Sequence, residues 1–382
     1  MAAATQVELQ HAPARNRFDP EFELLVAGCG CADPADLTPL LTLGLDWNHI
    51  LESAEHHRLI PALHAALAGK NGVPSTLRVR AHKHAWRVLH FTVELTKIAR
   101  CFERRGIKFL AHKGPALAQI LYGHPAMRQF GDLDVIVRPR DVAAARAALI
   151  ELGYEPRLKL SSRQEKSFLR SGYEYSLGLT ERNLVELQWQ IVPRFCSINF
   201  DVDALLSRSA QIDLDRLPLR TLGYDDLMLV LCVHAAKHEW SQLGMLRDIA
   251  TLARFDLDWK WIVTEARRLG ILKILQISLL AVREVFPIDL AGLAPLHVQG
   301  AAEIASAVVA RLQHDYEPAT ESLGYFRSQL QTRERLRDRV QFVWRLATTP
   351  GVEEWNAVRI SERYFSLYRG VRIARLLKRF LA

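Results

Sequence analysis

The chain has 382 residues, of which 49% are hydrophobic and 24% are charged, with 50 Lys and Arg against 42 Asp and Glu. This composition excludes a disordered chain, and the length predicts two or three domains rather than one small core. The net charge of +8 suits anionic partners such as nucleotides, nucleic acid or acidic lipid, but it selects none of them.

Signals for export or membrane insertion are not recognisable in the sequence. It does not open with a basic segment followed by an apolar one, and no apolar run reaches the roughly 18 residues needed to span a bilayer. The five cysteines are scattered, and Cys29 and Cys31 have no second pair that would complete a zinc site. We therefore expect reduced thiols and a cytoplasmic protein without a transmembrane segment.

Helical periodicity dominates the first 105 residues after a short polar start. Residues 1–20 contain two prolines and are predicted to form a flexible arm. Leucines and isoleucines then recur at three- and four-residue steps through residues 21–105, which predicts an N-terminal helical region. Its last helix is predicted over 76–105, with Gly106 as the C-terminal cap.

Strands and helices alternate from residue 106 to residue 222, which predicts a mixed α/β core there. The second of its two helices is expected to begin with Asp141 as N-cap. The predicted strands are 107–111, 133–137, 173–179 and 184–191, the last two paired as a hairpin across 180–183, and the predicted helices are 115–122 and 142–152.

The pattern from residue 223 to residue 382 is helical again. The mixed-charge run 332–339 is predicted to be a solvated helix face. The basic amphipathic helix 369–381 is expected to pack its leucine and isoleucine face on its own domain rather than on lipid or RNA. Four tryptophans are expected to supply core material: Trp259, Trp261, Trp344 and Trp355. The sequence thus predicts an α+β fold, a mixed-sheet core flanked by N-terminal and C-terminal helical regions.

The segment around Lys113-Gly114-Pro115 reads as a strand, a tight turn and the start of a helix. Proline suits the first position of a helix, because its missing N–H would be unpaired there. Gly114 has no Cβ, so a phosphate could approach the backbone at the helix N-terminus, and Lys113 could add a positive charge. The turn alone is a weak signal.

Asp132 and Asp134 lie two residues apart on a predicted strand, so both side chains project from the same face. Two such charges about 4 Å apart repel by about 4 kcal/mol at an effective dielectric near 20. A divalent cation would offset this repulsion, and oxygen-only ligands favour Mg²⁺ or Mn²⁺. Glu186, the lone acid in the largely apolar segment 184–189, is the best candidate for a third ligand. An Asp-x-Asp pair that only caps a strand edge is the alternative.

The stretch 112–137, HKGPALAQILYGHPAMRQFGDLDVIV, resembles the signature of the bacterial uncharacterised nucleotidyltransferase family. This family is a branch of the DNA polymerase beta-like nucleotidyltransferase superfamily. The similarity continues over nearly the whole chain, through 151–154, 184–189, 234–240, 246–250 and 368–376.

The resemblance implies a nucleotidyltransferase-type core, with a nucleoside triphosphate as substrate and catalytic acids at Asp132, Asp134 and Glu186 that also bind the metal. Lys113-Gly114 falls on the superfamily's phosphate-side turn, with Lys113 in the place of its first small residue. Gln188 stands where the family often has histidine.

Three further residues are candidates for nucleotide binding. Arg128, four residues before Asp132, could contact a phosphate or the acceptor, and a solvated loop arginine is the equal alternative. Lys237 and His238 could line a cleft between the C-terminal helices and the core. Zinc binding by His234 and His238 is less favoured, because no acid lies between them as in a metalloprotease helix.

Two functions follow from these residues. The first is an enzyme that moves a nucleoside monophosphate from a nucleoside triphosphate to an acceptor, with phosphoryl transfer as a variant. The acceptor could be a small molecule, a peptide, a protein or an RNA, and a biosynthetic tailoring role is allowed; binding to nucleic acid is not established. The second is a non-catalytic protein that binds a nucleotide or recruits a partner on the same fold.

Overall fold

The computed structural model describes residues 18–29, 37–180, 183–288, 290, 296–318 and 322–381. The first 17 residues of the predicted arm, Cys31 and the predicted turn at residues 181 and 182 lie outside this part. The last residues of the predicted arm already belong to a helix, because Asp19 caps the helix that starts at Pro20 by accepting a hydrogen bond from the Phe22 amide.

Five helices precede the sheet in the described residues, and the fifth is the longest. It ends at Arg104, and Gly106 follows with a φ of +66°, a left-handed conformation that glycine adopts without strain. The prediction that Gly106 ends this helix is confirmed. The five helices are α1 (Pro20–Gly28), α2 (Thr38–Leu41), α3 (Trp47–His56), α4 (Ile60–Ala66) and α5 (Ser75–Arg104).

The centre of the molecule is a five-stranded mixed sheet with the strand order β1-β2-β5-β4-β3. β2 runs antiparallel to β1 and parallel to β5, while the remaining neighbours are antiparallel. The strands are β1 (Phe109–His112), β2 (Asp132–Val137), β3 (Glu155–Pro156), β4 (Glu174–Thr180) and β5 (Asn183–Gln188). The mixed-sheet core and the predicted hairpin are confirmed, although the last strand ends at residue 188 rather than 191 and the first runs from 109 to 112.

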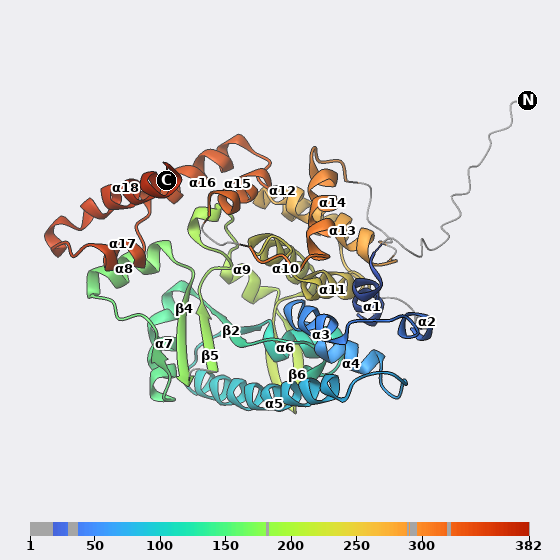
Figure 1. Cartoon of the computed structure of the whole chain (residues 1–382). Helices are drawn as coiled ribbons and strands as arrows, with labels where there is room; N and C mark the ends of the chain where they lie inside the picture. Colours follow the sequence, from blue (N-terminus) through green and yellow to red (C-terminus); the bar gives the residue numbers. More distant parts are fainter. Residues whose placement is uncertain are drawn as a thin grey trace, which may run out of the picture.

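Helix α5 covers the sheet at the bottom of the view in Figure 1. Its buried side chains, among them Phe91, Leu95 and Phe102, join a hydrophobic cluster with Val135 and Val137 of β2. Inside the same region the Tyr154 hydroxyl donates to the buried Glu94 of α5 at 2.7 Å. This packing fixes β2, the strand that carries the acid pair.

The helices within the core are α6 (Gly114–Tyr122), α7 (Val142–Glu151), α8 (Ser162–Ser171) and α9 (Val202–Ser207). The α6 and α7 predictions are confirmed to within a residue, but Asp141 makes no side-chain capping hydrogen bond at the start of α7. Helix α8 and the separate hairpin of β6 (Ala210–Leu214) and β7 (Leu217–Thr221) were not predicted. Both are short and contain few large apolar residues, so they carry little hydrophobic signal.

The C-terminal helices are α10 (Tyr224–Lys237), α11 (Leu243–Leu252), α12 (Trp259–Leu269), α13 (Leu272–Val285), α14 (Ala301–Leu312), α15 (Leu323–Gln331), α16 (Leu336–Thr348), α17 (Val352–Ala357) and α18 (Tyr368–Leu381). Residues of α10, α11 and α13 share one hydrophobic cluster with residues of α1, α3 and α4. The two helical regions therefore meet beside the sheet, and the predicted domain boundaries remain a proposal. None of the helices in the described residues is long and apolar enough to cross a bilayer.

Three expectations for the C-terminal helices were wrong. Trp344 is 67% exposed, because it lies on the outer face of α16. In the run 332–339, Thr332 and Arg333 are buried where the chain turns from α15 into α16. On α18, Ile373 and Leu377 are exposed, and this helix instead contacts the buried Glu354 of α17 through two arginines, Arg372 and Arg375.

Candidate active site

The acid pair lies at the start of β2, as its spacing predicts. Asp134 is 3% exposed, whereas Asp132, one pleat earlier, is partly exposed. Asp134 stands opposite Glu186 in the parallel β2–β5 pairing and opposite His112 in the antiparallel β1–β2 pairing. The sheet therefore brings three acids from two distant parts of the sequence to one place.

The turn between β1 and α6 lies directly beside this acid cluster. Gly114 has a φ of +48°, and a Cβ added there would lie 3.4 Å from the Asp132 carbonyl oxygen. Glycine is therefore favoured for its conformation and for its close approach to β2. Lys113 also has a positive φ, +54°, which costs a non-glycine residue of order 1–3 kcal/mol. Such strain at a turn beside buried acids is typical of functional sites.

Two side chains hold the acid cluster together. The Lys113 ammonium lies 3.1 Å from Asp134 Oδ1. The Gln188 amide nitrogen lies 2.8 Å from the same oxygen, 3.2 Å from Glu186 Oε2 and 3.3 Å from Glu174 Oε2. Lys113 thus contacts one of the acids directly. Glu174, on β4, is a fourth acid that the sequence did not single out.

The acids in this cluster bind protons more tightly than usual. Burial raises the pKa of Asp132, and the charge of Asp134 adds to the shift. Burial also raises the pKa of Asp134, against the opposing effect of Lys113. Burial and the charges of Glu174 and Asp132 raise the pKa of Glu186 to about 7. One ammonium is therefore not enough to neutralise the cluster.

An additional cation fits these residues. Asp134 Oδ2 is buried, and within the described residues it has no hydrogen-bond partner. An unpaired buried carboxylate oxygen is costly, and a hard divalent cation with oxygen ligands would satisfy it. Asp132, Asp134 and Glu186 are the residues that could hold such an ion.

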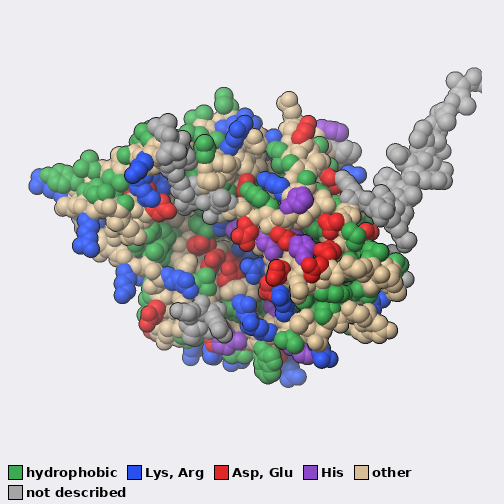
Figure 2. All heavy atoms as spheres, in the orientation of Figure 1, with side chains coloured by type: hydrophobic (Ala, Val, Ile, Leu, Met, Phe, Trp, Pro, Cys, Tyr) green, Lys and Arg blue, Asp and Glu red, His purple; other side chains and the backbone are tan. Residues whose placement is uncertain are grey.

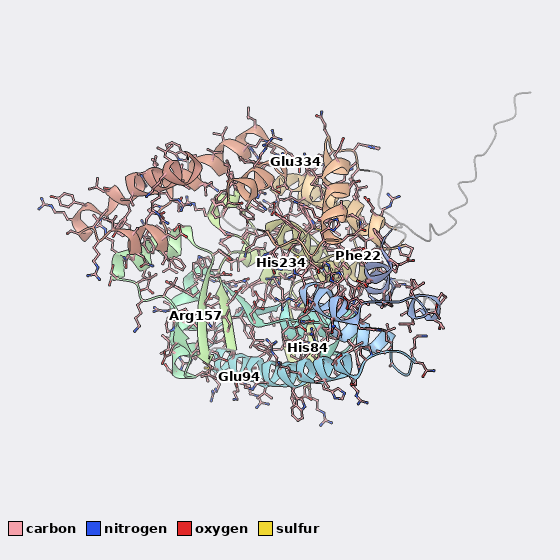
Figure 3. The ribbon with its side chains drawn as sticks, viewed as in Figure 1. Phe22, His84, Glu94, Arg157, His234 and Glu334 are labelled. Carbon is pink, nitrogen blue, oxygen red and sulfur yellow. The ribbon has the colours of Figure 1, made fainter. Side chains whose placement is uncertain are left out.

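A cavity of about 480 Å³ opens beside Asp132. Four of the predicted site residues line it: Lys113, Arg128, Asp132 and His238. Arg58, from the turn between α3 and α4, lines the cavity as well and has a φ of +62°. Figure 2 shows acidic, basic and histidine side chains gathered in the middle of this face, and Figure 3 places His234 between the sheet and the C-terminal helices.

Arg128 is a fixed part of this cavity and not a solvated loop residue. Its Nε donates to Asp248 Oδ2 at 2.8 Å, and the Tyr122 hydroxyl donates to the other oxygen of Asp248 at 2.7 Å. His84 of α5 also contacts the Arg128 carbonyl oxygen at 2.9 Å. A guanidinium held through Nε presents its two terminal nitrogens in a fixed direction, which suits recognition of a phosphate.

Two histidines of the cavity, His234 and His238, favour the neutral form. Burial lowers the pKa of His234, and it lowers that of His238 to about 3, with Lys237 and Lys113 adding to the latter shift. Their ring centroids lie 4.8 Å apart in an edge-to-face arrangement. Neutral imidazoles here can donate or accept a hydrogen bond without adding charge.

Lys237 is placed differently from His238. Its ammonium donates to the Tyr173 hydroxyl at 2.8 Å and lies 4.7 Å from the centre of that ring. It is not among the residues that line the 480 Å³ cavity. Lys237 therefore links α10 to the chain just before β4, and its role in nucleotide binding stays a prediction.

Several residues of the site escaped the sequence analysis. Glu174 could have been found by placing the hairpin in register, because it pairs with Gln188 two positions from Glu186. Arg58 gave no signal, since it lies in a turn between two ordinary helices more than 50 positions before the acid pair. Tyr122 was read only as the end of a helix.

The chain was compared with curated proteins and with solved structures. No curated protein matches the sequence. Three solved structures are similar over part of the chain. The lincomycin-bound lincosamide antibiotic adenylyltransferase LnuA is 13% identical, with 44% of this chain and 96% of that chain covered and a TM-score of 0.29. The antibiotic-resistance factor ANT(2'')-Ia is 11% identical (51% of this chain and 92% of that chain covered, TM-score 0.31), and an antigenic nucleotidyltransferase-like protein from Paracoccidioides brasiliensis is 13% identical (51% of this chain and 88% of that chain covered, TM-score 0.33). They are too distant to assign a substrate.

The sequence itself matches a protein family over residues 44–287, which is more than half of the chain. The matched region begins before α3, includes the whole five-stranded sheet and the acid cluster, and ends after α13. It thus contains Arg58, the acids of β2 and β5, and Asp248, all of which meet at the cavity or beside it. The chain belongs to the family of uncharacterised nucleotidyltransferases, enzymes that transfer nucleotidyl groups.

Proposed function

We propose that this protein transfers a nucleoside monophosphate from a nucleoside triphosphate to an acceptor hydroxyl or phosphate, with Mg²⁺ or Mn²⁺ bound by Asp132, Asp134 and Glu186. The observation that carries the proposal is the orphaned Oδ2 of Asp134 within a cluster of acids beside a cavity rich in cations. A bound divalent ion would neutralise the triphosphate and the charge that develops at the α-phosphate.

The residues around the cavity have separate roles in this proposal. Gly114 lets the triphosphate approach the backbone at the start of α6, and Arg128 contacts a phosphate while Asp248 and Tyr122 keep it in place. His238 contributes a neutral hydrogen-bonding group on the opposite wall. In this proposal Glu186, whose pKa is raised to about 7, accepts the proton of the acceptor hydroxyl.

The acceptor stays open among small molecules, peptides, proteins and RNA. The cavity has a volume of about 480 Å³, within the usual range of a site for one small ligand. A nucleotide bound there would fill much of this space, so the acceptor would enter at the open side. Phosphoryl transfer at the same acids is a variant, and only analysis of the product distinguishes the two reactions.

A second candidate function is nucleotide binding without catalysis. The ion pair between Lys113 and Asp134 favours it, because a lysine already offsets part of the acidic charge. The raised pKa of Glu186 argues in the other direction, since it shows that this compensation is incomplete.

The proposal is tested by thermal unfolding with ATP, CTP, GTP and UTP, each with Mg²⁺ and with EDTA. At one hundred times the dissociation constant, binding adds about 2.7 kcal/mol to the stability, a shift of a few degrees. We expect a shift that needs Mg²⁺ and disappears in Asp132→Asn with Asp134→Asn. The exposed Asp213 and Asp215 have the same Asp-x-Asp spacing, so their double Asn variant is the matched control. No shift with any nucleotide in the folded wild type would make the acid pair structural.

Glu186→Gln separates the enzyme from the binding protein. An enzyme loses turnover in this variant, measured as release of pyrophosphate, while it keeps part of its Mg²⁺-dependent nucleotide binding. A binding protein shows no turnover in the wild type, and in the variant its nucleotide-dependent shift in melting temperature is unchanged or slightly altered.

A further inference from the structure

A second hollow lies away from the candidate active site, between α13, α14, α15 and α16 at the top of the view in Figure 1. We call it the upper groove; its volume is about 840 Å³. It shares no lining residue with the cavity beside Asp132. Its walls are Lys273, Gly300, Ile304, Arg327, Leu330, Gln331, Arg339, Val340, Val343, Trp344 and Ala347.

Apolar side chains of α16 form one wall of the upper groove. Val340, Val343, Trp344 and Ala347 recur at steps of three, one and three residues, so they lie on one face of the helix. Val340 is 60% exposed, Val343 50% and Trp344 67%. Large apolar side chains gathered at this exposure mark a surface that gains stability when a ligand covers it.

The charged residues of the groove are all cations: Lys273, Arg327 and Arg339. Lys273 is only 8% exposed, yet its ammonium forms no hydrogen bond or ion pair within the described residues. Glu334, labelled in Figure 3, accepts a hydrogen bond from the Lys273 backbone amide at 2.7 Å and not from the ammonium. Burial lowers the pKa of Lys273, and the nearby charge of Arg339 lowers it further. An ammonium without a partner in a groove with apolar walls attracts an anion.

The start of α14 lies at the same point. Gly300 is its N-cap residue and provides no side chain to cap the helix. A Cβ added to Gly300 would lie 3.3 Å from the Lys273 ammonium, so this ammonium is at the N-terminus of the helix. The first turn contains Glu303, whose charge favours the protonated form of Lys273. A helix N-terminus and an unpaired ammonium both attract a negative group to this position.

From this geometry we infer that the upper groove binds a free, single-chain anionic amphiphile, with its carboxylate or phosphate head at Lys273 and the start of α14, and its apolar chain against Val340, Val343 and Trp344. Lys273, which is 8% exposed, lies deeper in the groove than Val340, Val343 and Trp344, which are open to solvent. A ligand therefore enters head first, which a lipid held in a bilayer does not do, because its head group stays at the membrane surface.

Isothermal titration calorimetry with monomeric dodecyl phosphate and dodecanoate tests this site. We expect both to bind the wild type, and at least tenfold weaker binding by Lys273→Met, which keeps the apolar stem and removes the charge. Trp344→Ala should weaken binding at least threefold. The matched controls lie on α5, where Lys83 and Trp86 are exposed, and Lys83→Met and Trp86→Ala should bind as the wild type does.

Four results would overturn the inference. Equal binding of dodecyltrimethylammonium would show that the head-group charge is irrelevant, and inorganic phosphate binding as tightly as dodecyl phosphate would leave only an anion site. If Lys273→Met binds with unchanged affinity and has a melting temperature at or above that of the wild type, Lys273 does not contact the head group. Binding to phosphatidylcholine–phosphatidylglycerol vesicles without binding to either monomeric amphiphile would make the groove a membrane contact.

Discussion

Two clusters of side chains in this protein have the residue types of a metal site, and they differ in the electron pairs that they leave available. The first is the acid cluster of Asp132, Asp134 and Glu186. The second consists of His56, His57 and Asp315, whose ligand-type atoms all lie within 4.8 Å of one another. Distance alone would rank the second above the first, because among the described residues only the second brings three ligand-type atoms within 4.8 Å of one another.

The hydrogen bonds of His57 decide the matter for the second cluster. Its Nδ1 accepts from the Leu243 amide at 3.2 Å, so in the neutral ring Nε2 carries the hydrogen. Nε2 lies 3.1 Å from both the Leu312 carbonyl oxygen and Asp315 Oδ1, and it can donate to either. Ser53 also donates to that oxygen of Asp315 at 2.7 Å. Neither ring nitrogen of His57 has a free electron pair for a metal, whereas Nε2 of the neighbouring His56 is buried without a hydrogen-bond partner in the described residues.

In the acid cluster the unsatisfied atom is a carboxylate oxygen, because Asp134 Oδ2 is likewise buried without a partner in the described part of the chain. The comparison teaches that proximity alone does not identify a ligand site, because His57 already uses both of its ring nitrogens in hydrogen bonds. The histidine cluster joins α3 to the chain after α14, whereas the acid cluster is incomplete by itself.

The largest expected effect is on catalysis by the acid cluster. Asp134→Asn keeps the shape of the side chain and removes its charge, so nucleotidyl transfer should fall on the order of 10³-fold. Release of pyrophosphate from the preferred nucleoside triphosphate measures this loss. The exposed Asp213→Asn is the control and should keep wild-type turnover. Activity within threefold of the wild type in Asp134→Asn would contradict the assignment of catalysis to the acid cluster.

The next effect is on stability through the histidine cluster. His57→Leu leaves the Leu243 amide and Asp315 without their partner, and should lower the free energy of unfolding by about 3 kcal/mol. Urea unfolding measures the change. Because His57 holds no metal, the difference in unfolding free energy between wild type and variant should be the same with EDTA and with added Zn²⁺. Stabilisation of the wild type alone by Zn²⁺ would identify a metal site there.

A smaller effect is expected from pH. Burial lowers the pKa of His84 to about 4, so the folded protein keeps this ring neutral while the unfolded chain binds a proton below about pH 6.5. The contribution of His84 to the free energy of unfolding is therefore fully present above pH 6.5 and falls as the pH drops. The loss is about 2 kcal/mol between pH 7 and pH 5. Urea unfolding of His84→Gln at both pH values should show a correspondingly weaker dependence. An identical pH dependence in the variant would contradict the assignment.

The smallest effect concerns the orientation of Arg128. Asp248→Asn weakens the contact that holds the guanidinium, so the KM for the nucleotide should rise about tenfold with little change in kcat. Tyr122→Phe removes only the hydrogen bond to Asp248 and should raise the KM less. A fall in kcat without a change in KM would show that Asp248 acts on the chemical step instead.

The sequence by itself determined the features that depend on local spacing. Asp132 and Asp134 share a strand face because side chains alternate along a strand, and Gly106 and Gly114 mark two of the turns where φ is positive. The choice of Glu186 as a third acid followed from its isolation in an apolar strand, and the register opposite Asp134 agrees with it. The outline of helices, mixed core and helices was readable for the same reason.

Only the tertiary structure decided which distant groups share a site. The β4–β5 register brings Glu174 to the acid cluster, and the packing of α3 and α4 against the C-terminal helices brings Arg58 to the cavity. Lys113 contacts Asp134 because the strained turn directs its side chain back toward β2. The unpaired ammonium of Lys273 and the exposed wall of α16 are likewise invisible in the sequence, since whether a charge is paired depends on neighbours far along the chain.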